Sequence, residues 1–385
     1  MKKFLALLLA LVMSLSLVAC GGGDDTAADG GADAEDGGNA ETAAYQVAMI
    51  TDYGDITDQS FNQTTYEACQ EFCDAEGLQF EYYKPAGDST AERVAMVDAA
   101  VADGYNVIVM PGYAFAETIK ETAELYPDVT FIALDVAQGD LGEDYTVPSN
   151  VYCAVYQEEL CGYMAGYAAV KMGYTHLGFL GGMAVPAVVR YGYGFVQGAD
   201  AAAADLGTTA TVEYVYGNAF AGDADITAYM DNWYQTLGVE VVFACGGGIY
   251  TSAAEAAAKV GGKVIGVDVD QAGIIDGGYG DGMTVTSAMK GLAPTVEHIL
   301  TEIAAGNFAN YGGKIETLGL VSGDDPTANY VQLPMESTQW CDTFTQDNYK
   351  ELVKSMFDGT ITVSNDTTAM PATTAVTVNE YGNIK

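Results

Sequence analysis

The chain has 385 residues, of which 53 are acidic and 14 are basic, and its formal net charge at pH 7 is −39. A surface this acidic repels phosphates, so the composition excludes a nucleic-acid-binding protein, which would normally present a basic patch. Apolar residues make up 49% of the chain, enough for a sizeable core, and a chain of this length more often forms two lobes than one.

The first segment of the chain predicts export. Lys2 and Lys3 precede a short apolar run that ends at Cys20. A basic start, an apolar stretch and small residues before a cleavage point are typical of a secretory signal peptide, here residues 1–19. Residues 17–20 (LVAC) resemble the bacterial lipobox, so we expect Cys20 to be lipidated and the mature protein to be anchored on the extracytoplasmic face of the cell membrane. The alternatives are an uncleaved N-terminal anchor and a signal peptide cut without lipidation.

The segment after the cleavage point predicts a tether. Residues 21–44 contain seven acidic and no basic residues and too few apolar residues to fold, so residues 20–44 should form a disordered acidic linker that begins at the lipidated cysteine. A flexible chain of this length spans roughly 25–30 Å, at about 5–6 Å times the square root of the residue number. We therefore expect the folded body to stand away from the membrane.

From residue 45 onward, short apolar runs alternate with longer segments of helical period, which predicts an α/β architecture with parallel strands. The predicted strands are residues 46–51, 79–83, 106–111, 130–134, 150–155, 176–181, 211–216, 239–244, 263–268 and 283–287. The predicted helices are residues 63–75, 90–103, 114–126, 158–172, 188–205, 225–236, 249–260 and 293–305.

Two such series in succession predict two doubly wound parallel-sheet lobes joined by a hinge. We expect lobe 1 to contain residues 45–153 plus 283–385 and lobe 2 to contain residues 154–282, with hinges near 151–155 and 273–283. Ligands of such sheets bind outside the carboxyl ends of the strands, where loops lead into helices. The loops of the two lobes should therefore face one another across a cleft.

The loop after the first predicted strand, residues 51–63, combines carboxylates with an amide and an aromatic residue just before a helix. One interpretation is that its polar residues only cap that helix. The functional interpretation is a ligand platform, in which Phe61 stacks on a flat group while Asn62 and Asp52 make hydrogen bonds. A second aromatic residue, Phe220, follows the predicted strand 211–216. One aromatic per lobe suits a clamp around a planar base, and each stacked ring contributes about 1–3 kcal/mol.

Polar residues also end two later strands. Asp268 ends the run 263–268, and a carboxylate there suits a vicinal diol such as ribose. Lys290 follows the next strand, where it could fix Asp268 and reach a sugar oxygen, or simply form an exposed salt bridge. Gly246 and Gly247 lie in a glycine run that allows close backbone approach to a ligand, but the run lacks the lysine of a phosphate-binding loop. Several carboxylates around one lysine favour a neutral, hydroxyl-rich ligand over a phosphorylated one.

These segments together resemble the basic membrane protein family of bacterial substrate-binding lipoproteins, the purine nucleoside receptor-like proteins of ABC transporters. The likeness runs in order over nearly the whole body, and no single motif carries it. Its segments are 51–63 (TDYGDITDQSFNQ), 178–186 (GFLGGMAVP) with Arg190 and 194–198, 264–271 (VIGVDVDQ), 286–290 (TSAMK) and the helix–turn–strand close 352–363 (LVKSMFDGTITV).

The resemblance implies a two-lobe, periplasmic-binding-protein-like receptor that captures nucleosides, chiefly of purines, and delivers them to the permease subunits of an ABC importer without catalysis. It implies that Phe61 and Phe220 sandwich the base and that Asn62 and Asp135 read the base edges. It also implies that Asp268 and Lys290 hold the ribose. Gly246 or Gly247 would supply a close backbone contact.

The sequence departs from the family pattern in places. Residues 217–223 match the family's aromatic-plus-Asp segment only loosely, and Tyr191 and Gly192 stand where the family usually has an aromatic residue followed by an acid. The second stacking residue and the base preference could therefore differ from those of the family. The chain's tyrosines offer other cleft aromatics, namely Tyr53, Tyr113 and Tyr250.

Two other classes of function, a nucleoside hydrolase and a binding lipoprotein for sugars or peptides, fit the sequence less well. Asp52, Asp55 and Asp58 could bind Ca²⁺ as in acid-rich nucleoside hydrolases, but their spacing lacks the full ligand set of a calcium loop. A binding lipoprotein for sugars or peptides predicts a tryptophan-lined groove, and Trp233 and Trp340 lie on no predicted cleft loop. We therefore expect a binding protein that is not an enzyme.

Metal and disulfide chemistry have little support. The histidines His176 and His298 are the only two, and no CxxC spacing is present, so we expect no metal and no cofactor. Secretion permits disulfides, but six cysteines allow 15 pairings, and the sequence leaves free or paired cysteines open. These cysteines are Cys69, Cys73, Cys153, Cys161, Cys245 and Cys341.

Overall fold

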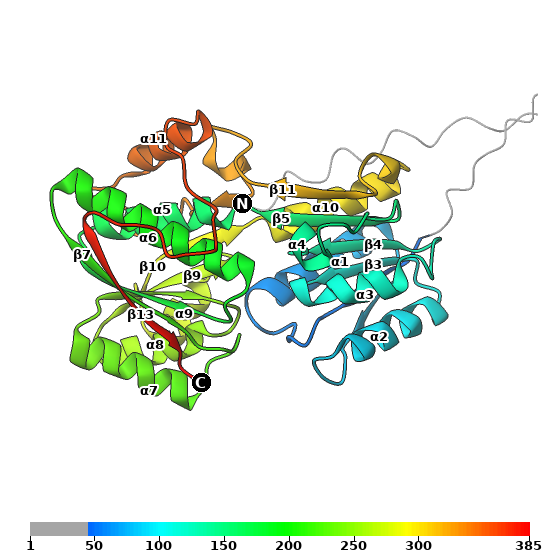
Figure 1. Cartoon of the computed structure of the whole chain (residues 1–385), viewed down its shortest axis with the longest axis horizontal. Coiled ribbons are helices and arrows are strands. Elements are labelled where there is room, and N and C mark those ends of the chain that lie inside the picture. The colour runs from blue at the N-terminus through cyan, green and yellow to red at the C-terminus, as the bar shows by residue number, and fades with distance from the viewer. Residues whose placement is uncertain (1–44) are drawn as a thin grey trace, which may run out of the picture. The chain divides into compact units, whose positions relative to one another are not determined.

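The computed structural model describes residues 45–385. The expected signal peptide, Cys20 and the tether lie outside these residues. The described chain forms two α/β lobes, each built on its own sheet with helices on both faces (Figure 1). The predicted fold class is confirmed. Each predicted strand is present, with bounds that differ by three residues at most.

The sheet of lobe 1 has six strands in the order β11-β5-β4-β3-β1-β2, all paired in parallel. Its strands are β1 (Val47–Ile50), β2 (Phe80–Tyr83), β3 (Val107–Pro111), β4 (Thr130–Leu134), β5 (Val151–Tyr156) and β11 (Lys314–Leu318). Its helices are α1 (Phe61–Glu76), α2 (Thr90–Ala102), α3 (Ala116–Thr122), α4 (Gln138–Leu141) and α10 (Leu292–Ala304). Helices α1 and α10 pack together on one face, and α2 packs on α3 on the other.

The sheet of lobe 2 has seven strands in the order β12-β10-β9-β8-β6-β7-β13, and only the short β12 runs antiparallel to its neighbour. Its strands are β6 (His176–Gly181), β7 (Ala210–Tyr216), β8 (Val241–Cys245), β9 (Lys263–Asp268), β10 (Thr284–Lys290), β12 (Val331–Gln332) and β13 (Val376–Asn383). Its helices are α5 (Glu158–Lys171), α6 (Pro186–Leu206), α7 (Ala224–Asn232), α8 (Tyr250–Ala258), α9 (Ala272–Tyr279) and α11 (Gln346–Phe357).

The expected lobe boundaries are wrong for most of the chain after residue 283. Strands β10, β12 and β13 all join the sheet of lobe 2, and only α10 and β11 return to lobe 1. The physical reason is burial: six of the seven residues of β10 are buried, so this strand needs neighbours on both sides, and it pairs in parallel with β9.

The chain crosses between the lobes three times. The first crossing is Gln157, between β5 and α5, and the second is Gly291, between β10 and α10. The third is the connection 319–330 between β11 and β12. The first crossing lies two residues after the expected hinge 151–155, which is itself part of β5. The second expected hinge is wrong, because 273–283 stays within lobe 2.

The expected helix–turn–strand close at 352–363 is only half correct. Helix α11 ends at Phe357, and Gly359 follows with a left-handed φ of 72°. The amide of Ile361 then donates to the carbonyl of Ser355 at 3.0 Å. The residues expected to form a strand thus turn back onto the end of the helix, and the last strand, β13, comes later.

Helices α5 and α6 pack unusually closely in lobe 2. Gly162 and Gly166 on α5 face α6, and Gly194 and Gly198 on α6 face α5. A Cβ atom added at any of these four positions would lie 2.0–2.1 Å from a carbonyl oxygen of the opposite helix. The two helices therefore touch backbone to backbone, which only glycine allows.

All six cysteines in residues 45–385 are unpaired, and five of them are buried. Among the same residues, no helix is both long and apolar enough to cross a membrane.

Candidate ligand-binding site

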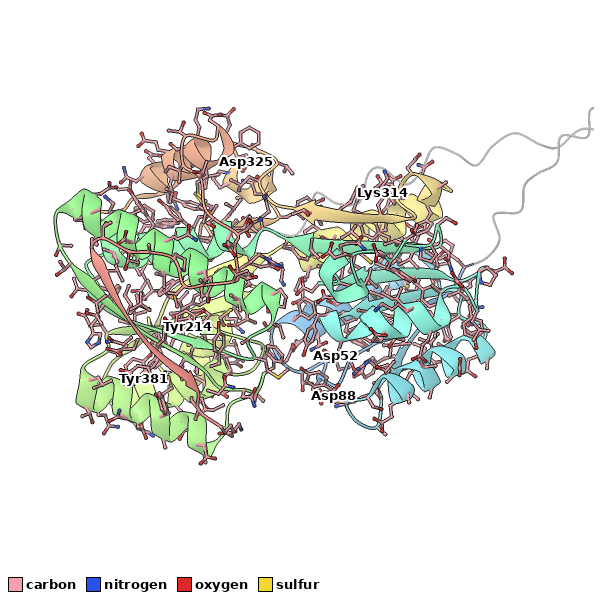
Figure 2. All side chains as sticks on the ribbon, in the orientation of Figure 1. Asp52, Asp88, Tyr214, Lys314, Asp325 and Tyr381 are labelled. Atoms are coloured by element: carbon pink, nitrogen blue, oxygen red, sulfur yellow. The ribbon has the colours of Figure 1, made fainter. Side chains whose placement is uncertain are left out.

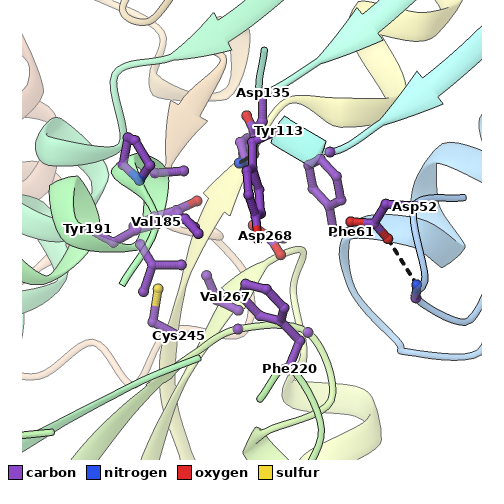
Figure 3. Close-up of a pocket in the computed structure, with 18 of the residues that line it drawn as sticks. Asp52, Phe61, Tyr113, Asp135, Val185, Tyr191, Phe220, Cys245, Val267 and Asp268 are labelled. Atoms are coloured by element: carbon purple, nitrogen blue, oxygen red, sulfur yellow. Dashed lines mark hydrogen bonds and ion pairs between the residues drawn. The ribbon is translucent and has the colours of Figure 1, made fainter. Parts of the chain in front are cut away.

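A cavity lies between the two lobes at the carboxyl ends of their parallel strands (Figure 3). It encloses about 850 Å³, part of it open to solvent, a size suited to a small molecule. The structure brings together all the ligand residues predicted from the sequence, since each of them lines this cavity. They are Asp52, Phe61, Asn62, Asp135, Phe220, Gly246, Gly247, Asp268 and Lys290.

The loop before α1 both caps the helix and lines the cavity, so its two interpretations are compatible. The Asp58 carboxylate accepts hydrogen bonds from the amides of Ser60, Asn62 and Gln63, each at 3.0 Å. The Asn62 side chain also donates to Asp58 at 3.0 Å, which fixes the orientation of its amide. Its carbonyl oxygen is buried and has no hydrogen-bond partner within residues 45–385, so it is free to accept a donor from a ligand.

Asp52 lies at the lobe 1 end of the cavity (Figures 2 and 3). One of its carboxylate oxygens accepts the amides of Tyr53 at 2.6 Å and Gly54 at 2.9 Å. Burial raises the pKa of this carboxyl despite those two hydrogen bonds. The same end of the cavity contains Tyr113, one of the alternative aromatics, whereas Tyr250 is not part of the lining.

The two phenylalanines come from different lobes. Phe61 is the first residue of α1 in lobe 1, and Phe220 lies on the loop that follows β7 in lobe 2. Gly182 and Gly246 make room for the ring of Phe220, because a Cβ at these positions would lie 2.4 Å and 3.0 Å from its Cδ1 atom. Gly246 therefore both lines the cavity and leaves space for the ring of Phe220.

Lys290 is the centre of a buried charge cluster. Its ammonium lies 2.6 Å from Asp135 and 3.3 Å from Glu158, and 2% of its side chain is exposed. Glu158 also pairs with Arg190 at 2.6 Å. The ring of Phe61 lies 4.9 Å from the ammonium nitrogen, close enough for a cation–π contact. The alternative of an exposed salt-bridge lysine is therefore wrong.

The expected pairing of Lys290 with Asp268 is also wrong. Asp268 instead accepts the hydroxyl hydrogen of Ser60 at 2.6 Å, a hydrogen bond that joins lobe 2 to lobe 1. Gln271 makes a second contact between the lobes through its side-chain amide, which donates to the carbonyl of Gln59 at 3.1 Å. With the Lys290–Asp135 pair, these bonds hold the lobes together around the cavity.

The electrostatics of the cluster follow from burial and proximity. Burial raises the pKa of Asp135 to about 6, and the Lys290 ammonium opposes that rise. Burial alone lowers the pKa of Lys290, but Asp135, Glu158 and Asp268 outweigh it, and the net pKa is raised. The side chain of Lys290 is therefore positively charged. One carboxylate oxygen of Asp135 remains buried without a hydrogen-bond partner in the described chain.

Two of the site's aspartates have strained backbones. Asp135, directly after β4, has a φ of 62°, and Asp268, at the end of β9, has a φ of 65°. Left-handed conformations of non-glycine residues cost free energy and persist where the surroundings enforce them, often at functional sites. The strain aims both carboxylates into the cavity.

Sequence reasoning gave no role in the site to Glu158, Arg190 or Ser60. A signal for Arg190 existed, because an arginine is rare in a chain with 14 basic residues. Glu158 has a topological signal, since it follows the end of β5 at the first crossing between the lobes. The three aspartates of the calcium alternative are each engaged separately. Asp58 caps α1, Asp52 binds its own loop, and Asp55 pairs with Lys84 at 2.8 Å.

The fold and the enclosed cavity define the class of protein: a two-lobe solute-binding protein of the periplasmic-binding-protein-like type. Residues 45–339 match the family described as ABC transporter substrate-binding protein PnrA-like. The chain belongs to this family, the one that its sequence resembles.

Relatives agree with this assignment. A CD4+ T-cell-stimulating antigen of Listeria innocua is 29% identical, with 82% of this chain and 87% of the relative covered. The ABC transporter nucleoside-binding protein BmpA of Lactococcus lactis subsp. cremoris is 27% identical, with 72% and 80% covered. A solved ABC transporter solute-binding protein of Aeropyrum pernix K1 has a TM-score of 0.63 at 21% identity, over 84% of this chain and 88% of that one, and supports the fold.

Proposed function

We propose that this protein is the receptor of an ABC importer that captures nucleosides, chiefly purine nucleosides, and delivers them to the permease subunits without chemical change. The observation that carries the proposal is the cavity between the lobes, whose lining includes aromatic rings from both lobes and the buried carboxylates Asp52 and Asp268. A planar base fits between rings, and a ribose offers hydroxyl donors to carboxylates. The nucleoside-binding relative from Lactococcus supports the same ligand class.

Each ligand residue predicted from the sequence has a proposed role. Phe61 and Phe220 stack on the base, while Asn62, Asp52 and Asp135 accept hydrogen bonds from its edge or from the sugar. Asp268 and Lys290 hold the ribose, and Gly246 and Gly247 allow close approach of the backbone. The Lys290–Asp135 pair and the Ser60–Asp268 hydrogen bond connect these roles to closure of the lobes.

A ligand panel tests the proposal. Calorimetry with adenosine, guanosine, inosine, cytidine, ribose and adenosine monophosphate should give micromolar or tighter binding for the purine nucleosides and far weaker binding for ribose. The monophosphate should bind poorly, because its dianion would enter a site with several buried carboxylates. Tight ribose or sugar binding, with nucleosides excluded, would show that the ligand class is wrong.

Two further parts of the proposal need separate tests. Incubation with inosine should leave it intact, and release of hypoxanthine would indicate a hydrolase.

We also propose that Cys20 is lipidated and that residues 20–44 tether the body to the outer face of the membrane. Cys20→Ser should then release the protein from the membrane fraction, and mass spectrometry of the wild-type N-terminus should find acyl chains.

A further inference from the structure

The chain end forms a strap over lobe 2, defined here as residues 364–385, which lies beyond the matched family region. The strap first crosses α6, where Gln197 exchanges two hydrogen bonds with the backbone of Ser364 at 3.0 and 2.9 Å. Asp200 then accepts the amides of residues 374–376 at 2.7–2.9 Å. Figure 1 shows the strap passing over α6 and continuing into β13.

Strand β13 completes the edge of the lobe 2 sheet beside β7. The two strands run in parallel, with Val376 opposite Ala210 and Glu380 opposite Tyr214. Strand β7 leads directly into the loop 217–222, which carries Phe220 into the cavity. The strap therefore pairs with β7, the strand that leads into the Phe220 loop.

A buried carboxylate holds the two strands together. Glu213 of β7 is 4% exposed, and it accepts hydrogen bonds from Tyr381 at 2.6 Å and from Asn379 at 3.1 Å, both on β13. Its other contact is His176 of β6 at 2.9 Å. Burial alone raises the pKa of Glu213, but the hydrogen bonds from Tyr381, His176 and Asn379 outweigh it and hold that pKa below its usual range.

The last residues of the strap touch both ends of the Phe220 loop. The amide of Ile384 donates to the carbonyl of Tyr216 at 2.9 Å, immediately before the loop. Lys385 forms an ion pair with Asp223, immediately after the loop, where Asp223 caps α7. The ring of Tyr381 also packs against Trp233, with 6.2 Å between the ring centroids.

The loop itself has few bonds of its own. Its first two residues bond to Gly181 and Gly182, and the carbonyl of Phe220 accepts the amide of Gly248 at 2.8 Å. Asn218 has a left-handed φ of 56°. Gly217 and Gly222 are the first and last residues of the loop. A short glycine-bounded loop with so few bonds has little stability by itself, and clamps at its two ends restrict its opening.

We propose that the strap is a positioning element of the ligand site, which holds the Phe220 loop in its binding conformation through Tyr381 and Lys385. The expected effect of the strap on nucleoside affinity rests on the proposed function, whereas its effect on the conformation of the Phe220 loop does not. A ligand then stacks on a ring that is already in place, and the entropy of ordering the loop is not lost again on binding.

Hydrogen exchange of the ligand-free protein tests the proposal directly. In Lys385→Ala, and more strongly in Tyr381→Phe/Lys385→Ala, amides of residues 217–223 should exchange faster than in the wild type, while those of 51–63 in lobe 1 should not change. Lys385→Arg should restore protection, because it keeps the ion pair with Asp223. Glu380→Ala is the matched control, since Glu380 lies on the same strand and is exposed.

Calorimetry with adenosine and guanosine provides the second measurement. The double variant should bind both roughly fivefold to tenfold more weakly, at the low end of the loss of one stacked ring, and Glu380→Ala should bind normally. Wild-type exchange rates at 217–223 in the double variant would overturn the proposal, and so would faster exchange with unchanged affinity. If the wild type binds no nucleoside, the proposed function fails, and the exchange rates alone decide whether the strap holds the loop.

Discussion

The two lobes use equivalent positions of one framework for different purposes. Strands β3 and β8 are each followed by a glycine of positive φ, Gly112 and Gly246, and β4 and β9 each lead to an aspartate of left-handed φ, Asp135 and Asp268. The next pair of strands breaks the equivalence. Strand β5 ends in the neutral Tyr156, whereas β10 ends in the charged Lys290.

This difference shows how a two-lobe receptor becomes asymmetric without a change of fold. Both lobes bring a carboxylate to the cavity, but lobe 2 alone brings an ammonium, Lys290, which pairs with Asp135 of lobe 1. Lys290 of lobe 2 donates to Asp135 of lobe 1. The carboxylate of Asp135 is therefore stabilised only when lobe 2 is in contact with lobe 1.

The largest effect is expected from Lys290→Met, which removes the feature that distinguishes the lobes. Asp135 would lose its cation and Glu158 would keep only Arg190, and breaking a buried pair in this way costs about 3–5 kcal/mol. Urea unfolding should show this loss, and adenosine affinity should fall by roughly a hundredfold or more. Lys314→Met, at an exposed lysine of lobe 1, is the control. Unchanged adenosine affinity in Lys290→Met would remove Lys290 from the site.

The two phenylalanines allow a direct comparison between the lobes. Phe61→Ala and Phe220→Ala should each weaken adenosine and guanosine binding by about 1–3 kcal/mol if both rings stack on the base. Phe357→Ala, at a ring that is 47% exposed on α11, should leave binding unchanged. A loss in only one variant, measured by calorimetry, would mean that one lobe alone supplies the stacking surface.

The close helix pair of lobe 2 should be sensitive to a single methyl group. Gly198→Ala would place a Cβ 2.0 Å from the carbonyl oxygen of Tyr163, and overpacking of this kind costs about 1–3 kcal/mol. Gly139→Ala in α4 of lobe 1 has open space around the added atom and should be neutral. Equal melting temperatures for the two variants would contradict backbone contact between α5 and α6.

The smallest effect concerns pH. Burial is the main cause that raises the pKa of Glu159 to about 7, with Glu158 adding to the rise and Arg190 opposing it. A carboxyl with a raised pKa favours folding below its unfolded value and loses that contribution as pH rises through about 7. Lowering the pH from 8 to 6 should therefore stabilise the wild type by on the order of 1 kcal/mol.

Glu159→Gln should remove most of that pH dependence in urea unfolding, because the substituted amide does not titrate. Glu117→Gln, at an exposed glutamate of α3, is the control and should keep the wild-type response. An unchanged pH dependence in Glu159→Gln would assign the effect to another group.

The sequence predicts the central strands and the lining of the site well, and its failures have physical causes. Runs such as 107–111 are buried on both faces and are apolar throughout. Strands β11 and β13 lie instead at sheet edges and are rich in polar residues, and of all their residues only Val376 is buried. Edge strands carry little hydrophobic pattern, so their sheet cannot be assigned from sequence. This is why β11 and β13 were not predicted, whereas β10 was predicted but assigned to the wrong lobe, because its apolar pattern does not specify which sheet it joins.

The lining of the site was predictable because loops after parallel strands converge on one edge of each sheet. The partners within the site were not. The backbone conformation of Asp135 and the crossing at Gln157 decide that Lys290 meets Asp135 and Glu158 rather than Asp268. Such contacts depend on how two lobes meet, which residue spacing along one chain does not specify.

The glycine contact between α5 and α6 has a mechanical consequence. Helix α5 begins one residue after the crossing at Gln157, and α6 begins beside the cavity with Pro186. Two helices that touch backbone to backbone have no side-chain layer that can shear between them. We therefore expect α5 and α6 to move as one rigid unit, so that a rotation at Gln157 would displace the cavity wall at Pro186 together with α5.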